Sequence, residues 1–161
     1  MSDQKQRQQF ERCIEDLVQT KSVTELKDIP LHLNQNCYEH SLFVAYMSYT
    51  ICSRFGWDYV SAARGGLLHD LYLYNWRDKD SHEGLHGFTH PKVALKNAQK
   101  LCPLNKIEEN IIVRHMWPLT TIPPRYKEAF VVSFADKVCA LVEISRLYHR
   151  LQIRQKLAFA L

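Results

Sequence analysis

Apolar residues recur at helical spacing along most of the chain. Between residues 37 and 55, one histidine and several apolar side chains fall at i, i+3, i+4, i+7 and i+11, counted from His40. The same spacing predicts further helices over about 3–20, 58–69, 89–101, 105–115 and 125–150, with a short one beginning at Ser22. No convincing strand, repeat or low-complexity tract is visible. The pattern therefore predicts an all-α protein, a single-domain helical bundle.

Residues typical of helix ends support these boundaries. Ser22 with Glu25 and Asn105 with Glu108 resemble capping boxes, and Asp58 is a typical N-cap. Thr89 is expected to cap a helix that holds His90 and Pro91 in its first turn. Gly56 is expected to end the helix that begins at residue 37.

The last predicted helix is strongly apolar. Its apolar positions are Phe130, Phe134, Ala140, Leu141 and Ile144, with Lys137 among them, and Asp136 falls in the same region. We expect this face to point into the core. A buried carboxylate is costly unless it meets a cation or a metal, so Asp136 is a candidate functional residue.

Composition and charge narrow the function classes. The chain has 161 residues, 46% apolar, which suits one domain with a full core. Its net charge is +4 and no run of like charges occurs, so the sequence does not indicate a nucleic-acid-binding surface. No apolar stretch is long enough for a membrane span, and residues 1–9 lack a signal-peptide core. Five cysteines without a C-x-x-C pair predict free thiols. These features predict a cytoplasmic protein that does not bind membranes.

Six residues of metal-ligand type form an ordered series. They are His40, His69, Asp70, His90, His115 and Asp136. The intervals between the successive positions, apart from the adjacent pair 69–70, are 20 to 29 residues, about one helix plus one connection. Each ligand site can thus lie on a different helix and point to one place. Imidazole and carboxylate together bind divalent ions. The series predicts a site for two divalent metals, with Asp70 bridging them because a carboxylate has two oxygens.

Each histidine alone has a plainer explanation, a hydrogen-bonded core residue. The regular series favours the metal site. Under this hypothesis His40, His69 and Asp136 serve one metal, and His90 and His115 serve the other. Manganese, iron, zinc, nickel and magnesium all remain open as the metal.

The segments around this site are less decisive. Gly65 and Gly66 precede the central His-Asp pair by one turn and predict close helix packing beside it. Tyr72, Tyr74 and Trp76 are expected either in the core or in a wall of the pocket. Residues 78–87 are expected to form a solvated loop that holds His82 and His86. A role for those two histidines as lid contacts or proton donors remains open.

The chain resembles the HD superfamily of metal-dependent phosphohydrolases. The matching segments are Glu39-His40, Gly-Leu-Leu-His69-Asp70, Phe88-Thr-His90-Pro, Ile111-Ile-Val-Arg-His115 and Phe-Ala-Asp136-Lys137. The resemblance implies an all-α fold with a central metal site, in an HD domain over residues 37–150. Residues 1–36 are then a helical extension, and 151–161 a tail that packs on the domain or on a partner, with a homodimer as one possibility. The histidines at positions 90 and 115 place the chain with the two-metal members.

This resemblance implies hydrolysis of a phosphate ester of a nucleotide or a related small molecule. Asp70 would orient the nucleophile, and Lys137 would neutralise charge on the phosphate, with a lysine on the helix surface as the equal alternative. Arg114 and Arg77 are weaker candidates for substrate binding. Two alternatives stay open: a di-iron oxygenase of the same fold, and a non-catalytic metal-binding module.

Overall fold

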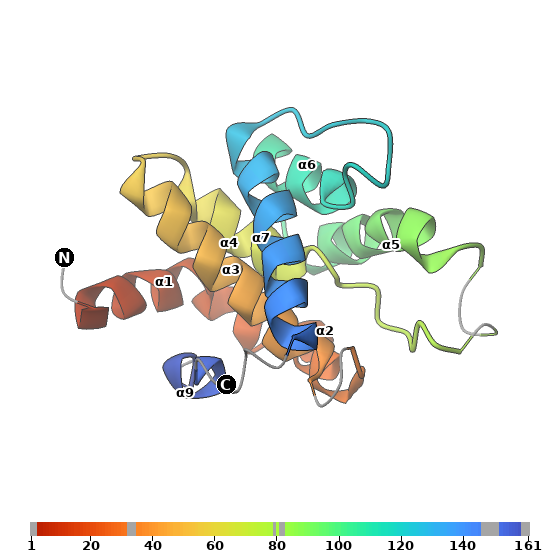
Figure 1. Cartoon of the computed structure of the whole chain (residues 1–161), viewed down its shortest axis with the longest axis horizontal. Coiled ribbons are helices and arrows are strands. Elements are labelled where there is room, and N and C mark those ends of the chain that lie inside the picture. Colours follow the sequence, from red (N-terminus) through yellow and green to blue (C-terminus); the bar gives the residue numbers. More distant parts are fainter. Residues whose placement is uncertain (1–2, 32–34, 79, 81–82, 146–151, 159–161) are drawn as a thin grey trace.

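A computed structural model describes residues 3–31, 35–78, 80, 83–145 and 152–158. Most of these residues are helical, and irregular connections occupy 69–78 and 115–126. Within the described ranges no strand forms, and Pro30 and Asn36 make an isolated bridge. The all-α prediction is confirmed. The elements, labelled in Figure 1, are α1 (Asp3–Val18), α2 (Lys21–Thr24), the 3₁₀ helix η1 (Glu25–Asp28), α3 (Cys37–Arg54), α4 (Tyr59–Leu68), α5 (His86–Leu101), α6 (Lys106–Arg114), α7 (Lys127–Ile144) and α9 (Ile153–Lys156).

Three of the predicted helix ends are confirmed. The side chain of Asp58 accepts a hydrogen bond of 2.9 Å from the backbone N–H of Ser61 at the start of α4. Asn105 and Glu108 form a reciprocal capping box at the start of α6. Gly56 adopts a φ of +66° directly after α3, a conformation that glycine takes without strain.

Two other helix starts were predicted wrongly. Helix α2 begins at Lys21, before Ser22, and its N-cap Thr20 uses its hydroxyl to donate back to the carbonyl of Leu17. Helix α5 begins at His86 because the carbonyl of Leu85 accepts backbone N–H groups, and Thr89 also donates its hydroxyl back to Leu85. Thr89 is therefore not a cap. Pro91 lies inside α5, and the loop ends before His86.

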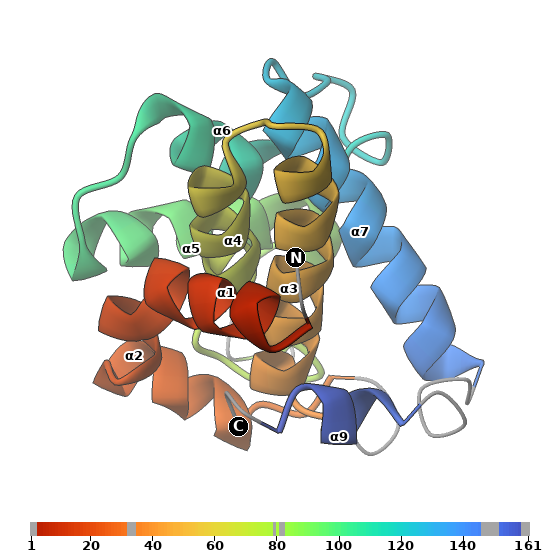
Figure 2. The ribbon, with the colours of Figure 1, turned by 90° about the vertical axis from the view of Figure 1, so that its left-hand side faces the viewer.

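Helices α3 and α4 form the centre of the bundle (Figure 2). Helix α1 packs on α4, and α7 packs on α3, α4 and α6. Two buried clusters result. The first contains Phe10, Leu42 and Leu67, and the second contains Val44, Ile111 and Val132. The metal-ligand residues lie at the ends and inner faces of the helices that surround these clusters.

The predicted inward face of the last helix is wrong. Helix α7 buries a set of small or branched side chains against the second cluster, among them Ala129, Val132, Ala135 and Cys139. Phe130, Phe134, Leu141 and Ile144 lie exposed instead. Both faces are apolar, so the sequence could not show which one is buried. The predicted extension of this helix to residue 150 falls partly outside the described residues, and α7 ends at Ile144.

Gly65 and Gly66 allow the close packing that the sequence predicted. A Cβ atom on Gly66 would lie 2.9 Å from the Cα atom of Ala45 in α3, and one on Gly65 would lie 2.7 Å from Cδ1 of Ile111 in α6. Both distances are shorter than real Cβ contacts. The two glycines therefore bring α4 close to α3 and α6, one turn before His69.

The C-terminal tail packs on the domain in the part that is described. Ile153 and Leu157, in and just after α9, are buried in the first cluster. The last residues of this tail, 159–161, lie outside the described ranges, so their predicted contact with a partner stays a prediction. Among the described helices, none combines the length and the apolarity that crossing a membrane requires.

Candidate metal centre

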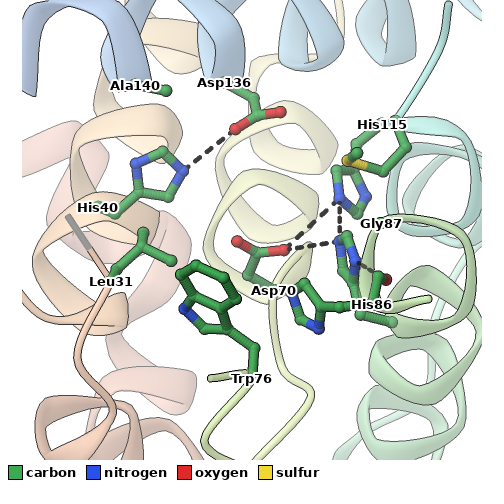
Figure 3. A pocket seen from close by; sticks show the side chains of 11 residues that line it. Leu31, His40, Asp70, Trp76, His86, Gly87, His115, Asp136 and Ala140 are labelled. Carbon is green, nitrogen blue, oxygen red and sulfur yellow. Dashed lines mark hydrogen bonds and ion pairs between the residues drawn. The ribbon is translucent and has the colours of Figure 1, made fainter. Parts of the chain in front are cut away.

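The fold brings all six predicted metal-ligand residues to one place. His40 lies in the first turn of α3, His69 is the C-cap residue of α4 with Asp70 directly after it, and His115 is the C-cap residue of α6. His90 lies in α5 and Asp136 in α7. All four imidazoles are buried. Five of the six residues line one pocket, and Figure 3 labels four of them: His40, Asp70, His115 and Asp136.

Hydrogen bonds at Nδ1 fix the orientation of every imidazole. A carbonyl or carboxylate oxygen can only accept, so Nδ1 carries the hydrogen in each case and Nε2 of the neutral ring carries a lone pair. The bonds run from His69 to the carbonyl of Gly66 (2.7 Å), from His90 to that of His86 (2.7 Å), from His115 to that of Ile112 (2.8 Å), and from His40 to the carboxylate of Glu143 (2.9 Å).

These lone pairs face one another across the site. The Nε2 atoms of His90 and His115 are 2.8 Å apart, a distance that requires a proton or a metal ion between two lone pairs. Asp70 Oδ1 lies 3.2 Å from Nε2 of His90 and 3.5 Å from Nε2 of His115. Asp70 Oδ1 and His69 Nε2 are buried without a hydrogen-bond partner. Unpaired buried acceptors of this kind are what a cation satisfies, so the donor set fits a divalent metal.

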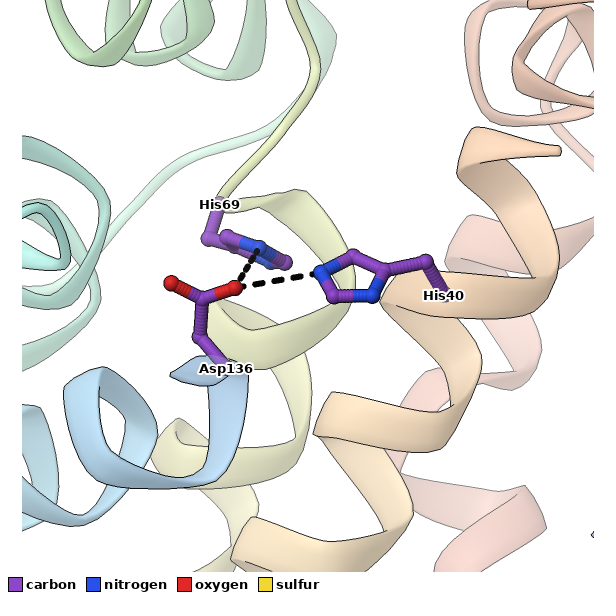
Figure 4. A group of neighbouring side chains, drawn as sticks. All are labelled: His40, His69 and Asp136. Carbon is purple, nitrogen blue, oxygen red and sulfur yellow. Dashed lines mark hydrogen bonds and ion pairs between the residues drawn. The ribbon is translucent and has the colours of Figure 1, made fainter. Parts of the chain in front are cut away.

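A second group of ligand atoms adjoins the first. Asp136 Oδ1 lies 3.1 Å from Nε2 of His40 and 3.7 Å from Nε2 of His69 (Figure 4). The other oxygen of Asp70, Oδ2, lies 3.4 Å from Nε2 of His69. Two triads have ligand atoms within 4.8 Å of one another: His40, His69 and Asp136, and His69, Asp70 and His115. The two oxygens of Asp70 thus face different histidines.

The charges of the site balance one another. Burial alone would raise the pKa of Asp70 and of Asp136, but the neighbouring histidines hold both pKa values below the usual range. Burial lowers the pKa of His40, yet the carboxylates of Glu143 and Asp136 raise it well above its ordinary value. Burial and the charges on His69 and His90 lower the pKa of His115 to about 3. Without metal, the two carboxylates beside His40 therefore favour a proton on its ring, where a bound cation would take over the same charge.

Metal binding is expected to release protons near neutral pH. Because the pKa of His40 is raised, its ring carries a proton at pH 7 that a metal must displace. The apparent metal affinity should therefore weaken as the pH falls. Calorimetric titration in two buffers of different ionisation enthalpy measures the release directly. Equal binding enthalpies in both buffers would contradict the expectation.

Glu143 is a site residue that the sequence analysis missed. It lies on α7, is 3% exposed, and accepts the Nδ1–H of His40, while Asp136 lies on the Nε2 side of the same ring. A carboxylate in this position orients a metal-binding imidazole and increases its basicity. Its spacing of seven residues, two helical turns, from Asp136 was the available signal.

Replacing Glu143 with glutamine is expected to weaken metal binding by about 10- to 100-fold. The amide keeps the volume of the side chain but loses the negative charge that favours His40 as a ligand. Competition titration against a metal-chelating dye measures the affinity. Glu128→Gln is a matched control, because Glu128 is equally buried on α7 but accepts a backbone N–H from Asp58 away from the site. Equal affinities of the two variants would contradict a positioning role for Glu143.

A pocket of about 280 Å³ opens beside the ligand residues. Its remaining lining is mostly apolar and includes Leu31, Trp76, Met116 and Ala140 (Figure 3). His86 also lines it, although the sequence favoured a solvated loop for this residue. Its ring stacks on His90 with centroids 4.4 Å apart, and its Nδ1 lies 3.0 Å from the hydroxyl of Tyr74. His82 lies outside the described residues.

The aromatic segment before α5 serves both predicted purposes. Tyr72 is buried in the core, where the thiol of Cys37 donates to its hydroxyl, and Trp76 lines the pocket. Arg77 lies at the rim, where it donates to the carbonyl of Leu31 (2.9 Å) and lies over the ring of Trp76. Arg114 is half-buried at the end of α6 and does not line the pocket.

Lys137 is directed at the protein backbone. Its Nζ donates to the carbonyls of His115 (2.8 Å) and Ser133 (3.0 Å) and lies 3.5 Å from Asp136 Oδ2. In this arrangement it ties the end of α6 to α7 and pairs with the oxygen of Asp136 that faces away from the histidines. Contact with a substrate phosphate stays a prediction for this residue.

Comparison with known proteins gives one match. A family model described as HD domain matches residues 37–141, more than half of the chain and all six ligand residues. No curated protein and no solved structure matches the chain.

Proposed function

This chain belongs to the HD domain family, and we propose that it is a metal-dependent phosphohydrolase with two divalent metals in its site. The proposed substrate is a phosphate ester of a nucleotide or of a related small molecule. The family is commonly hydrolytic and its domains bind divalent metals, so the finer proposal concerns the number of ions and the bond that is cleaved.

One observation carries the proposal. Four buried imidazoles direct their Nε2 atoms at two carboxylates and at one another, with 2.8 Å between those of His90 and His115. Two neighbouring triads, one with Asp136 and one with Asp70, share His69. We assign His40, His69 and Asp136 to one metal and His90 and His115 to the other. Asp70, whose oxygens face different histidines, would bridge them.

The chain's own residues prepare the site for phosphate chemistry. Two bound divalent metals supply an activated water at neutral pH and stabilise charge on the phosphate oxygens. Asp70 would orient that water, and the contacts of both its oxygens with the predicted ligand histidines support this role. Lys137 keeps Asp136 in place and adds one positive charge beside the site. The apolar lining of the pocket excludes bulk water around the reacting group.

The pocket favours a small substrate. Its volume, about 280 Å³, is at the lower end for small-molecule sites. Among the described lining residues, the acidic and imidazole groups belong to the ligand set or to His86, and no lysine or arginine is present. A single phosphate group on the metals with an uncharged remainder against Trp76 and Met116 fits this lining better than a polyphosphate.

Metal analysis combined with substrate assays tests the proposal. The protein is purified without chelator and without air, its metals are measured, and it is assayed with aryl phosphates, nucleoside monophosphates and nucleoside triphosphates. About two metals per chain and metal-dependent release of phosphate from monophosphates are expected. One metal or none per chain would contradict the dinuclear site. Turnover that requires iron and consumes oxygen would replace the hydrolase with an oxygenase, and bound metal without turnover on any ester would indicate a binding module.

A further inference from the structure

Helix α7 carries a second apolar face that the fold leaves exposed. We infer that this face binds the same face of a second copy of the chain, with the two α7 helices antiparallel. The face, called here the α7 stripe, consists of Phe130, Phe134, Leu141 and Ile144, with Lys137 at its middle. The inference does not depend on the reaction that the metal site performs.

The exposure of the stripe is unusual for side chains of this size. Phe130 is 43% exposed, Phe134 61%, Leu141 67% and Ile144 57%. Together they present on the order of 400 Å² of apolar surface, the size at which a patch on a monomer marks an interaction site. On the opposite side, α7 buries Ala129, Val132 and Cys139 in the core. A helix that is apolar on both faces is normally covered on both.

The stripe also contains few charged groups, as the buried centre of a protein–protein interface does. Three of the charged side chains of α7, those of Glu128, Asp136 and Glu143, point into the protein. Lys137 turns its ammonium to the carbonyls of His115 and Ser133. The part of Lys137 that lies in the stripe is therefore its chain of methylene groups, which adds apolar surface.

The described tail does not cover the stripe. Ile153 and Leu157 are already buried in the first cluster, beside residues of α1 and α3. Within the described residues, the centre of the stripe stays open: Phe134 is 61% and Leu141 67% exposed.

The spacing of the stripe points to a second copy rather than to an unrelated partner. Positions 130, 134, 137, 141 and 144 are separated by four, three, four and three residues, the spacing at which two helices pack side by side. The pattern is also nearly the same when read from either end. Two antiparallel copies with a two-fold axis between positions 137 and 138 would therefore set Phe134 against Leu141, and Phe130 within one position of Ile144. Such self-complementarity is what a symmetric dimer requires.

Lys137 fits the position beside the two-fold axis. Two lysines that faced each other there would repel, but each ammonium is already bound to its own chain, 2.8 Å from the carbonyl of His115. The dimer would also cover the stem of Lys137 and so shield the contact between its Nζ and Asp136. Dimerisation would thus enclose one side of the metal site.

Sedimentation analysis of the full chain at tens of micromolar tests the inference. The wild-type protein is expected at twice the chain mass of 18.9 kDa. Phe134→Glu and Leu141→Glu are each expected to halve that mass, because they place charges in the centre of the stripe. Phe55→Glu is the matched control: Phe55 is 63% exposed at the end of α3, outside the stripe, and its replacement should leave the dimer intact.

Both stripe variants must keep the circular dichroism spectrum and the metal content of the wild-type protein, which shows that they fold. This is expected because Phe134 and Leu141 are exposed. A monomeric wild-type protein would overturn the inference, as would a dimer that survives both substitutions.

Disulfide crosslinking tests the orientation of the helices. In the antiparallel arrangement, Phe134→Cys and Leu141→Cys chains crosslink with each other when mixed and oxidised, far more than either does with itself. Crosslinks of each variant with itself alone would show parallel helices and overturn the antiparallel arrangement.

Discussion

Replacing Asp70 with alanine is expected to abolish both metal binding and hydrolysis. Asp70 Oδ1 faces His90 and His115, and Oδ2 faces His69, so one substitution removes ligand atoms from both halves of the site. Asp136 would then be the one carboxylate left among the predicted metal ligands. Loss of the bound metals should reduce turnover by several orders of magnitude, because the activated water depends on them. Elemental analysis and phosphate release measured on one preparation check both effects.

Asp70→Asn shows whether the negative charge of Asp70, rather than the volume of its side chain, is required. The amide fills the same space but cannot act as an anionic bridge, so we expect it to lose metal nearly as fully as the alanine variant. His90→Ala and His115→Ala keep Asp70, so they are expected to behave differently and retain about one metal per chain, held by His40, His69 and Asp136 together with Asp70. Full activity in Asp70→Asn, or complete metal loss in His90→Ala, would contradict the proposed division of ligands.

Local helix signals account for what the sequence predicted well. The capping box at Asn105 and the N-cap at Asp58 act within three residues, so they do not depend on the rest of the fold. The helix starts predicted at Ser22 and Thr89 were wrong, and the reason is also local. The hydroxyls of Thr20 and Thr89 donate backwards to carbonyls, an alternative that the sequence pattern does not exclude.

The convergence of the six ligand residues could be predicted because their spacing matched one helix per ligand site. Glu143 was missed although it lies two helical turns from Asp136, because its role depends on contact with His40, which lies 103 positions away. His86 was assigned to a loop because glycines and polar residues surround it, whereas its position depends on stacking with His90 and Trp76. The stripe on α7 was misplaced because periodicity finds apolar faces and does not show which of two faces meets the core.

Gly66→Ala is expected to destabilise the protein and to weaken metal binding together. In a helix interior, alanine is ordinarily about 1 kcal/mol more favourable than glycine. Here the added Cβ would lie 2.9 Å from the Cα of Ala45 and 3.2 Å from its backbone nitrogen, so α3 and α4 must separate. Overpacking of this kind costs about 1–3 kcal/mol. The carbonyl of Gly66 also holds Nδ1 of His69, which would move with it.

Gly65→Ala is the matched comparison, because the three atoms nearest to its Cβ would all belong to the side chain of Ile111. Adding Ile111→Ala should therefore relieve part of the cost at Gly65, so that the double variant is less destabilised than the sum of the two single changes. The same addition should not relieve Gly66→Ala, whose obstacle is the backbone of α3. Urea unfolding and metal titration measure both quantities. A Gly66→Ala protein that is more stable than wild type and binds metal normally would show that α3 and α4 can separate without displacing His69, and that the close approach of these helices is not what positions the site.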